Sequence, residues 1–154
     1  MSLLYQTDFP WNADVRRWGC YFLCLAYFGM RKGHEYTVKG LLHTWEEAVK
    51  GGIISGDLNG DGDRDDDGES CIMDPNGLCR LLDLPLRYLD KHFPVTEKIE
   101  ENHYAIVPWF NPRTQFTHFV VGLSRPVEYD PIRGGSVTVR EGWPKGLRLY
   151  EVLE

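Results

Sequence analysis

The stretch DVRRWGCYFLCLAYFG, residues 14–29, decides the first half of the fold. From residue 19 to residue 30 its apolar side chains recur at helical spacing and glycines punctuate the end, so the pattern predicts a helix that begins near Cys20. The free N–H groups and the dipole at a helix N-terminus both stabilise a thiolate. Cys24, one turn further along among apolar neighbours, is expected to be buried instead.

Two more helices are predicted in the first half of the chain. In YTVKGLLHTWEEAVKGG (36–52), Thr37 is the predicted N-cap, the apolar residues form one stripe, and two glycines stop the helix. DPNGLCRLLDL (74–84) places Asp74 and Pro75 at the cap and first-turn positions, a standard helix opening.

The second half reads as strands. Four short segments are rich in β-branched and aromatic residues and are bounded by Pro, Gly and Asn. They are HYAIVPWF (103–110), THFVVGLS (117–124), VEYDP (127–131) and LRLYEVL (147–153). Helices followed by an antiparallel sheet is the α+β pattern, and the lack of alternation between strands and helices argues against a doubly wound sheet. We therefore expect a single α+β domain over residues 1–154.

Charge and composition exclude several classes of function. The net charge is −6, and residues 57–69 hold seven acids and one base, so the remainder of the chain is neutral. Without a basic surface we expect no nucleic-acid partner. No membrane partner is expected either, because no apolar run approaches the roughly 18 residues of a membrane span. Residues 1–17 show no basic segment followed by an apolar one, so no signal peptide is expected, and the compartment stays open between the cytoplasm and export by another route.

The cysteines do not follow the spacing of a zinc site. Cys20 and Cys24 are separated by three residues, and Cys71 and Cys79 by seven, whereas zinc knuckles use tight pairs. Without a secretory signal, free thiols are expected rather than disulfides.

The predicted sheet offers a base and a carboxylate for Cys20. THFVVGLSRPVEYDP (117–131) reads as a hairpin with its turn near GLSRP. Opposite residues of an antiparallel pair have position numbers with a constant sum, so a sum of 248 would set His118 opposite Asp130, and any even sum keeps both on one face. A carboxylate beside an imidazole fixes its tautomer and stabilises the imidazolium. The three residues are thus candidates for nucleophile, base and orienter, although each alone also fits a plain structural role.

The order of these residues along the chain, a cysteine at a helix start followed by a histidine and an aspartate on strands, resembles that of papain-like cysteine peptidases. More similar still is the bacterial branch whose peptidase domains cleave double-glycine leader peptides, together with its peptidase-like relatives. The residues between about 31 and 102 match nothing in that family, and the matching stretches are YQTDFPW (5–11), GCYFLCLAYFG (19–29), THFVVG (117–122) and YDPIRGG (129–135).

The resemblance implies a papain-like fold, thiol chemistry on amide bonds, and no cofactor for the reaction. It assigns Cys20 as nucleophile, His118 as general base and Asp130 as orienter. The Cys20 backbone N–H would supply half of an oxyanion hole.

The sequence departs from that family near the cysteine. Papain-like enzymes usually carry a glutamine six residues before the nucleophile, where this chain has Asp14, whose negative charge would repel an oxyanion. Gln6 and Asn12 are the candidate substitutes, and Gln6 lies in the best-matching upstream stretch. Tyr21 stands where many relatives have a glycine, and we expect it to narrow the cleft.

The acidic segment DLNGDGDRDDDGE (57–69) predicts a calcium loop that resembles a degenerate EF-hand or dockerin-type loop. Its acidic and amide residues fall at positions 1, 3, 5 and 7 of such a loop, with Gly62 at position 6, but position 12 is Gly68. The candidate calcium ligands are Asp57, Asn59, Asp61, Asp63 and Glu69. A structural role is expected, because thiol chemistry needs no calcium; the alternative is a solvated acidic insert.

Three functions stay open on the sequence alone. The first is a thiol hydrolase that cleaves a peptide or isopeptide bond, with leader peptides and peptidoglycan-type cell-wall peptides as candidate substrates by analogy. The second is a catalytically inactive pseudo-peptidase, a calcium-stabilised module that binds a peptide or a protein. The third is an acidic partner-binding protein that uses the 57–69 loop as its contact.

Overall fold

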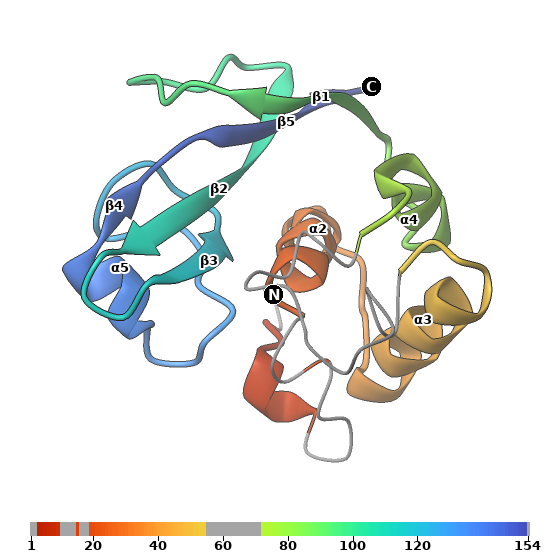
Figure 1. The fold of residues 1–154 in the computed structure, drawn as a ribbon. Coiled ribbons are helices and arrows are strands. Elements are labelled where there is room, and N and C mark those ends of the chain that lie inside the picture. Colours follow the sequence, from red (N-terminus) through yellow and green to blue (C-terminus); the bar gives the residue numbers. More distant parts are fainter. Residues whose placement is uncertain (1–2, 10–14, 16–18, 55–71, 154) are drawn as a thin grey trace.

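The chain begins with helices and ends with an antiparallel sheet (Figure 1). A computed structural model describes residues 3–9, 15, 19–54 and 72–153. The helical half comprises the 3-10 turn η1 (Gln6–Asp8) and the helices α2 (Cys20–Arg31), α3 (Val38–Lys50) and α4 (Pro75–Leu81). The three helices predicted from the sequence are confirmed.

Local side-chain caps explain where α3 and α4 begin. The Thr37 hydroxyl accepts a hydrogen bond from the Gly40 N–H at 2.9 Å, and the Asp74 carboxylate accepts one from the Gly77 N–H at 2.9 Å. Pro75 occupies the first position of α4, where its missing N–H costs nothing. Both predicted caps are therefore correct.

The sheet fills the second half of the chain. Its strands are β1 (Leu86–Phe93), β2 (His103–Asn111), β3 (Phe116–Val120), β4 (Trp143–Pro144) and β5 (Leu147–Val152), and the short helix α5 (Val137–Glu141) precedes β4. Within the described residues the sheet order is β1-β5-β2-β3, with β4 paired to β2, and every pairing is antiparallel. The predicted α+β class is confirmed.

The prediction that the second half consists only of strands is wrong in detail. Segment 127–131 is not a strand and contributes a single bridge, between Tyr129 and Val121. Helix α5 was not expected, because its β-branched residues favour strands. Ser136 overrides that preference by capping the helix, with its hydroxyl accepting from the Val139 N–H at 3.2 Å.

Strand β2 is buried on both faces, which explains its continuous apolar sequence. Tyr104 and Ile106 belong to the core that includes α2, whereas Val107 and Trp109 belong to a second core on the side of α5. The alternation follows from the two-residue period of a strand. The sheet therefore lies between α2 on one face and α5 on the other.

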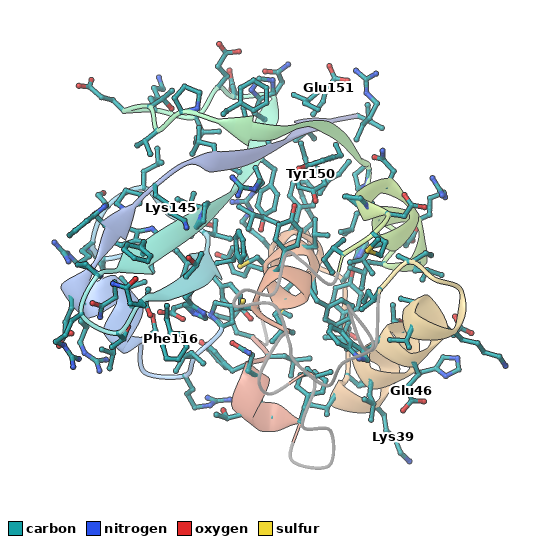
Figure 2. The ribbon with its side chains drawn as sticks, viewed as in Figure 1. Lys39, Glu46, Phe116, Lys145, Tyr150 and Glu151 are labelled. Carbon is teal, nitrogen blue, oxygen red and sulfur yellow. The ribbon has the colours of Figure 1, made fainter. Side chains whose placement is uncertain are left out.

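Helix α2 is enclosed by the rest of the fold. It lies between the sheet and the α3–α4 pair (Figure 1), and every residue from Cys20 to Met30 is buried. Phe28 packs edge-on against Tyr104 of β2, with ring centroids 5.0 Å apart. Tyr150 points from β5 toward α2, whereas Lys39 projects outward from α3 (Figure 2).

Removal of the α3 cap tests this account of the helical half. Thr37→Ala deletes the bond from the Gly40 N–H, and we expect the free energy of unfolding to fall by about 1 kcal/mol in urea titrations. Lys39→Ala, an exposed change on the same helix, is the control and should stay within about 0.5 kcal/mol of the wild type. Equal effects of the two substitutions would contradict the assignment of Thr37 as a cap.

Candidate active site

Cys20 is the first residue of α2, as the sequence predicts. The Gly19 N–H donates to the Val15 carbonyl at 2.9 Å, and the Leu23 N–H donates to the Gly19 carbonyl at 2.9 Å. A Cβ at position 19 would lie 2.5 Å from the Val15 oxygen, so only glycine fits before Cys20. The first N–H groups of a helix have no partner within the helix, which leaves this end suited to negative charge.

His118 joins the Cys20 side chain to Asp130. The His118 Nε2 and Asp130 Oδ1 atoms are 2.7 Å apart, and the same ring interacts with the Cys20 side chain. All three side chains are buried, with exposed fractions of 4% for Cys20, 9% for His118 and 8% for Asp130. The structure therefore brings together the three residues that the sequence nominated.

The packing of α2 on β3 sets the approach of Cys20 to His118. Cys24, one turn after Cys20, donates from Sγ to the carbonyl of Phe119 at 3.3 Å, and Phe119 adjoins His118. Cys24 is fully buried, as predicted, and burial first, then the nearby charges of Cys20 and Asp130, raise its pKa well above the ordinary value. Cys24 is thus a core residue, and its contact fixes the position of the helix end.

The structure does not have the register sum of 248 that would set His118 directly opposite Asp130. Val121 lies opposite Tyr129, so the position numbers sum to 250 and His118 and Asp130 are offset rather than directly opposite. Because segment 127–131 makes one bridge and no strand, the contact between the two side chains does not follow from a ladder register, yet it has full hydrogen-bonding distance.

Asp130 is held by more donors than His118 alone. Its Oδ1 also accepts from the Ile132 N–H at 2.9 Å, and its Oδ2 accepts from the N–H and the hydroxyl of Ser136 at 2.8 and 2.7 Å. Burial raises the pKa of this carboxyl, but the bonds from His118, Ile132 and Ser136 outweigh burial and lower its pKa below the ordinary value. The sequence reasoning did not name Ser136, although a serine before an unrecognised helix is the signal of a cap.

His118 is protonated over a wide pH range in this setting. Burial lowers the pKa of the ring, but the hydrogen bonds to Asp130 and Cys20 and their charges outweigh burial and raise it to about 9. With Nε2 bonded to Asp130, the ring orientation is fixed and Nδ1 is the nitrogen left to serve Cys20. A buried thiol, an oriented imidazole and a stabilised carboxylate together form a proton-transfer relay.

Gln6 lies beside this relay. Its N–H donates to the Pro131 carbonyl at 2.9 Å, directly after Asp130, and its side-chain Nε2 donates to the Val15 carbonyl at 3.3 Å. Gln6 therefore contacts both the segment after Asp130 and Val15, which precedes α2, and it is 2% exposed. Arg133 reinforces this attachment by pairing with Asp8 at 3.0 Å.

Tyr21 does not narrow a cleft, contrary to the expectation. Its side chain is 1% exposed, its hydroxyl lies 2.7 Å from the Tyr150 hydroxyl, and its ring packs edge-on against Phe119 at 5.1 Å. Because the first turn of α2 is enclosed, the residue after Cys20 points into the core. The bulk of Tyr21 fills the interior between α2 and β5.

Several predicted residues lie outside the described part of the chain. These are Asp14, Asn12, Cys71 and the candidate calcium ligands Asp57, Asn59, Asp61, Asp63 and Glu69. Among the described residues no group of three His, Cys, Asp or Glu side chains could hold a metal. The two ends of segment 55–71 do meet, because Ile54 forms an antiparallel bridge with Ile72.

Comparisons of the chain with protein-family models, with curated proteins and with solved structures each find no match. Within residues 3–9, 15, 19–54 and 72–153, no helix has the length and apolar character needed to cross a bilayer.

Replacement of the Asp130 carboxylate tests the relay directly. Asp130→Asn removes the negative charge beside His118, so we expect the pKa of His118 to fall below its wild-type value of about 9. NMR titration of the ring measures the change, with the exposed His43 as internal control. An unchanged titration of His118 would show that Asp130 does not hold the imidazolium.

The same pair makes stability depend on pH in a defined direction. The folded-state pKa of His118 lies above its ordinary value of 6.5, so its contribution to stability is complete below about pH 6.5 and is lost as the pH rises through about 9. The free energy of unfolding should therefore fall over that window in the wild type and fall less in Asp130→Asn.

Proposed function

We propose that the chain is a papain-like thiol hydrolase that cleaves a peptide or isopeptide bond. The observation that carries this proposal is that one buried imidazole, on His118, is bonded to the carboxylate of Asp130 and interacts with the side chain of Cys20 at the start of α2. A thiol, a base and an orienter in mutual contact are the parts that acyl transfer by a cysteine requires.

The chemistry runs through an acyl-thioester. With its proton held on His118 as an imidazolium, Cys20 attacks the carbonyl carbon of the substrate as the thiolate. The C–N bond then breaks, and the leaving amine takes the proton from His118. Water, deprotonated by the same imidazole, attacks the thioester, releases the acid and restores the thiol. Asp130 keeps the ring oriented throughout, and the cycle needs no metal or organic cofactor.

The Cys20 N–H and Gln6 are the proposed oxyanion donors. Cys20 is at the first position of α2, and the N–H groups of a first helical turn have no acceptor within the helix. The Gln6 amide is bonded to the Val15 carbonyl, which also accepts from the N–H of Gly19, the residue before Cys20. In this role Gln6 would replace the glutamine that relatives carry at the position of Asp14.

The resemblance to leader peptidases and their relatives points to peptides as the substrates. Cell-wall peptides of the peptidoglycan type and secreted leader peptides are the two candidate groups, by analogy alone. Nucleic acid and membrane are not proposed as partners, since the charge outside the acidic segment is balanced.

A pseudo-peptidase on the same fold is the second candidate. Cys20 is only 4% exposed, and a nucleophile must reach its substrate. In this alternative the relay is retained as a buried polar network, and the chain binds a peptide or protein without cleaving it.

Selective alkylation separates the two functions. Iodoacetamide below neutral pH should label Cys20 far faster than Cys24, Cys71 or Cys79, because an imidazolium beside a thiol promotes its reaction and burial raises the pKa of Cys24 and Cys79. Cys20→Ser should abolish hydrolysis of peptide libraries, whereas Cys79→Ala, a buried cysteine of α4, should retain it. Equal and slow labelling of all four cysteines, with no Cys20-dependent cleavage, would favour the binding module.

We also propose that residues 57–69 bind a structural calcium ion. Seven carboxylates within this short segment repel one another, and a hard divalent cation with oxygen ligands relieves the repulsion. The bridge between Ile54 and Ile72, with the Met73 N–H donating to the Ile53 carbonyl at 2.8 Å, fixes both ends of the segment between α3 and α4. The expected ligands remain Asp57, Asn59, Asp61, Asp63 and Glu69.

Calcium removal tests this second proposal. Calcium should raise the thermal unfolding midpoint, since a ligand that binds only the folded state stabilises it, and EGTA should reverse the rise. Asp61→Ala, at loop position 5, should lose the effect, whereas Asp66→Ala, at position 10, removes an equal charge outside the ligand phasing and should keep it. Equal responses of the two variants would indicate a diffuse acidic patch.

A further inference from the structure

The two oxygens of the Asp130 carboxylate bind different side chains. Oδ1 faces His118 at 2.7 Å, and Oδ2 accepts both the backbone N–H and the hydroxyl of Ser136. Ser136 is 7% exposed, so this contact is shielded from water. Hydrogen bonds to a buried charge are stronger than those between neutral groups.

The loop between the two residues is shaped to bring Ser136 back onto Asp130. Gly134 and Gly135 adopt φ values of +85° and +93°, a left-handed conformation that side chains rarely adopt. The Gly135 N–H donates to the Ile132 carbonyl at 2.9 Å and closes the turn. The glycine pair thus places a serine six residues after the acid within reach of its carboxylate.

We propose that Ser136 is a positioning residue for the His118–Asp130 pair. Its hydroxyl and N–H hold Oδ2 so that Oδ1 stays directed at His118, and the same hydroxyl accepts from the Val139 N–H to start α5. The consequence for catalysis rests on the proposed hydrolase, whereas the restraint on Asp130 does not.

A hydroxyl is the group that meets both demands at once. It donates one proton, here to Asp130, and accepts with its lone pairs, here from Val139. Threonine retains both functions, and alanine loses both. The side chains that share this environment are His118 of β3, Cys20 and Cys24 of α2, and Tyr129. Burial is the main cause that raises the pKa of Cys24 and of Tyr129, and the charge of Asp130 adds to it.

The first arm of the test measures stability against pH and needs no enzymatic activity. The folded-state pKa of Asp130 is depressed, so its contribution is present above its ordinary value and is lost as the pH falls through the folded-state value. Ser136→Ala removes a hydrogen bond to the ionised carboxylate of Asp130, so the pKa of Asp130 is lowered by less than in the wild type. The stability deficit of Ser136→Ala relative to the wild type should therefore decrease on acidification.

Thr37→Ala is the matched control, because it removes a helix cap whose hydroxyl bonds a backbone N–H and no carboxylate. At pH 7 we expect the unfolding constant to rise about fivefold in Thr37→Ala and about ten- to hundredfold in Ser136→Ala. From pH 7 to pH 3 the ratio of the unfolding constants of Thr37→Ala and the wild type should stay constant. The corresponding ratio for Ser136→Ala should fall toward that of Thr37→Ala. Ser136→Thr should stay near the wild type. A Ser136→Ala ratio that is constant with pH would show that Ser136 is only a cap and would overturn the proposal.

The second arm measures peptide hydrolysis. Ser136→Ala should lower kcat about tenfold with little change in KM, since the restraint acts on the reacting groups. Ser136→Thr should restore the rate, and Thr37→Ala should leave it unchanged well below its unfolding temperature. If wild-type hydrolysis does not depend on Cys20, the proposed function fails, and the stability arm still decides the role of Ser136. A wild-type rate in Ser136→Ala would overturn the catalytic consequence.

Discussion

The packing of α2 against β3 is the contact on which the rest of the site depends. Cys24 donates to the Phe119 carbonyl, so the helix and the strand meet at one turn beyond Cys20 and one residue beyond His118. Because α2 is buried from Cys20 to Met30, the helix cannot slide or rotate without disturbing the core on several sides. The thiol and the imidazole are therefore brought together by apolar packing rather than by their own attraction.

The buried carboxylate of Asp130 organises the other half of the site. A charge removed from water is costly unless hydrogen bonds replace its hydration. Asp130 obtains them from His118, Ile132 and Ser136, which belong to β3, a tight turn and the start of α5. The N-terminal segment is attached to the same region through Gln6 and Pro131. Elements far apart in the chain thus meet at Asp130, because its buried carboxylate requires hydrogen-bond donors.

Local signals in the sequence predicted the helical half well. Thr37 and Asp74 cap α3 and α4 through bonds to residues only three positions away, so neighbouring residues are sufficient to locate these helix ends. The pairing of His118 with Asp130 was expected from a hairpin over 117–131, of which the structure keeps β3 and a single bridge between Val121 and Tyr129. Helix α5 was missed because Val137, Thr138 and Val139 favour strands, and the cap that decides the matter also bonds a distant carboxylate.

The sequence by itself determined the α+β order, the ends of the capped helices and the residue types available for chemistry. Only the tertiary structure decided the register sum of 250, the inward direction of Tyr21, the near-complete burial of Cys20 and the contact between Ser136 and Asp130. The reason is the range of the interactions. Caps and periodicity act within one or two turns, whereas burial and long-range contacts depend on which surfaces meet after the chain has closed on itself.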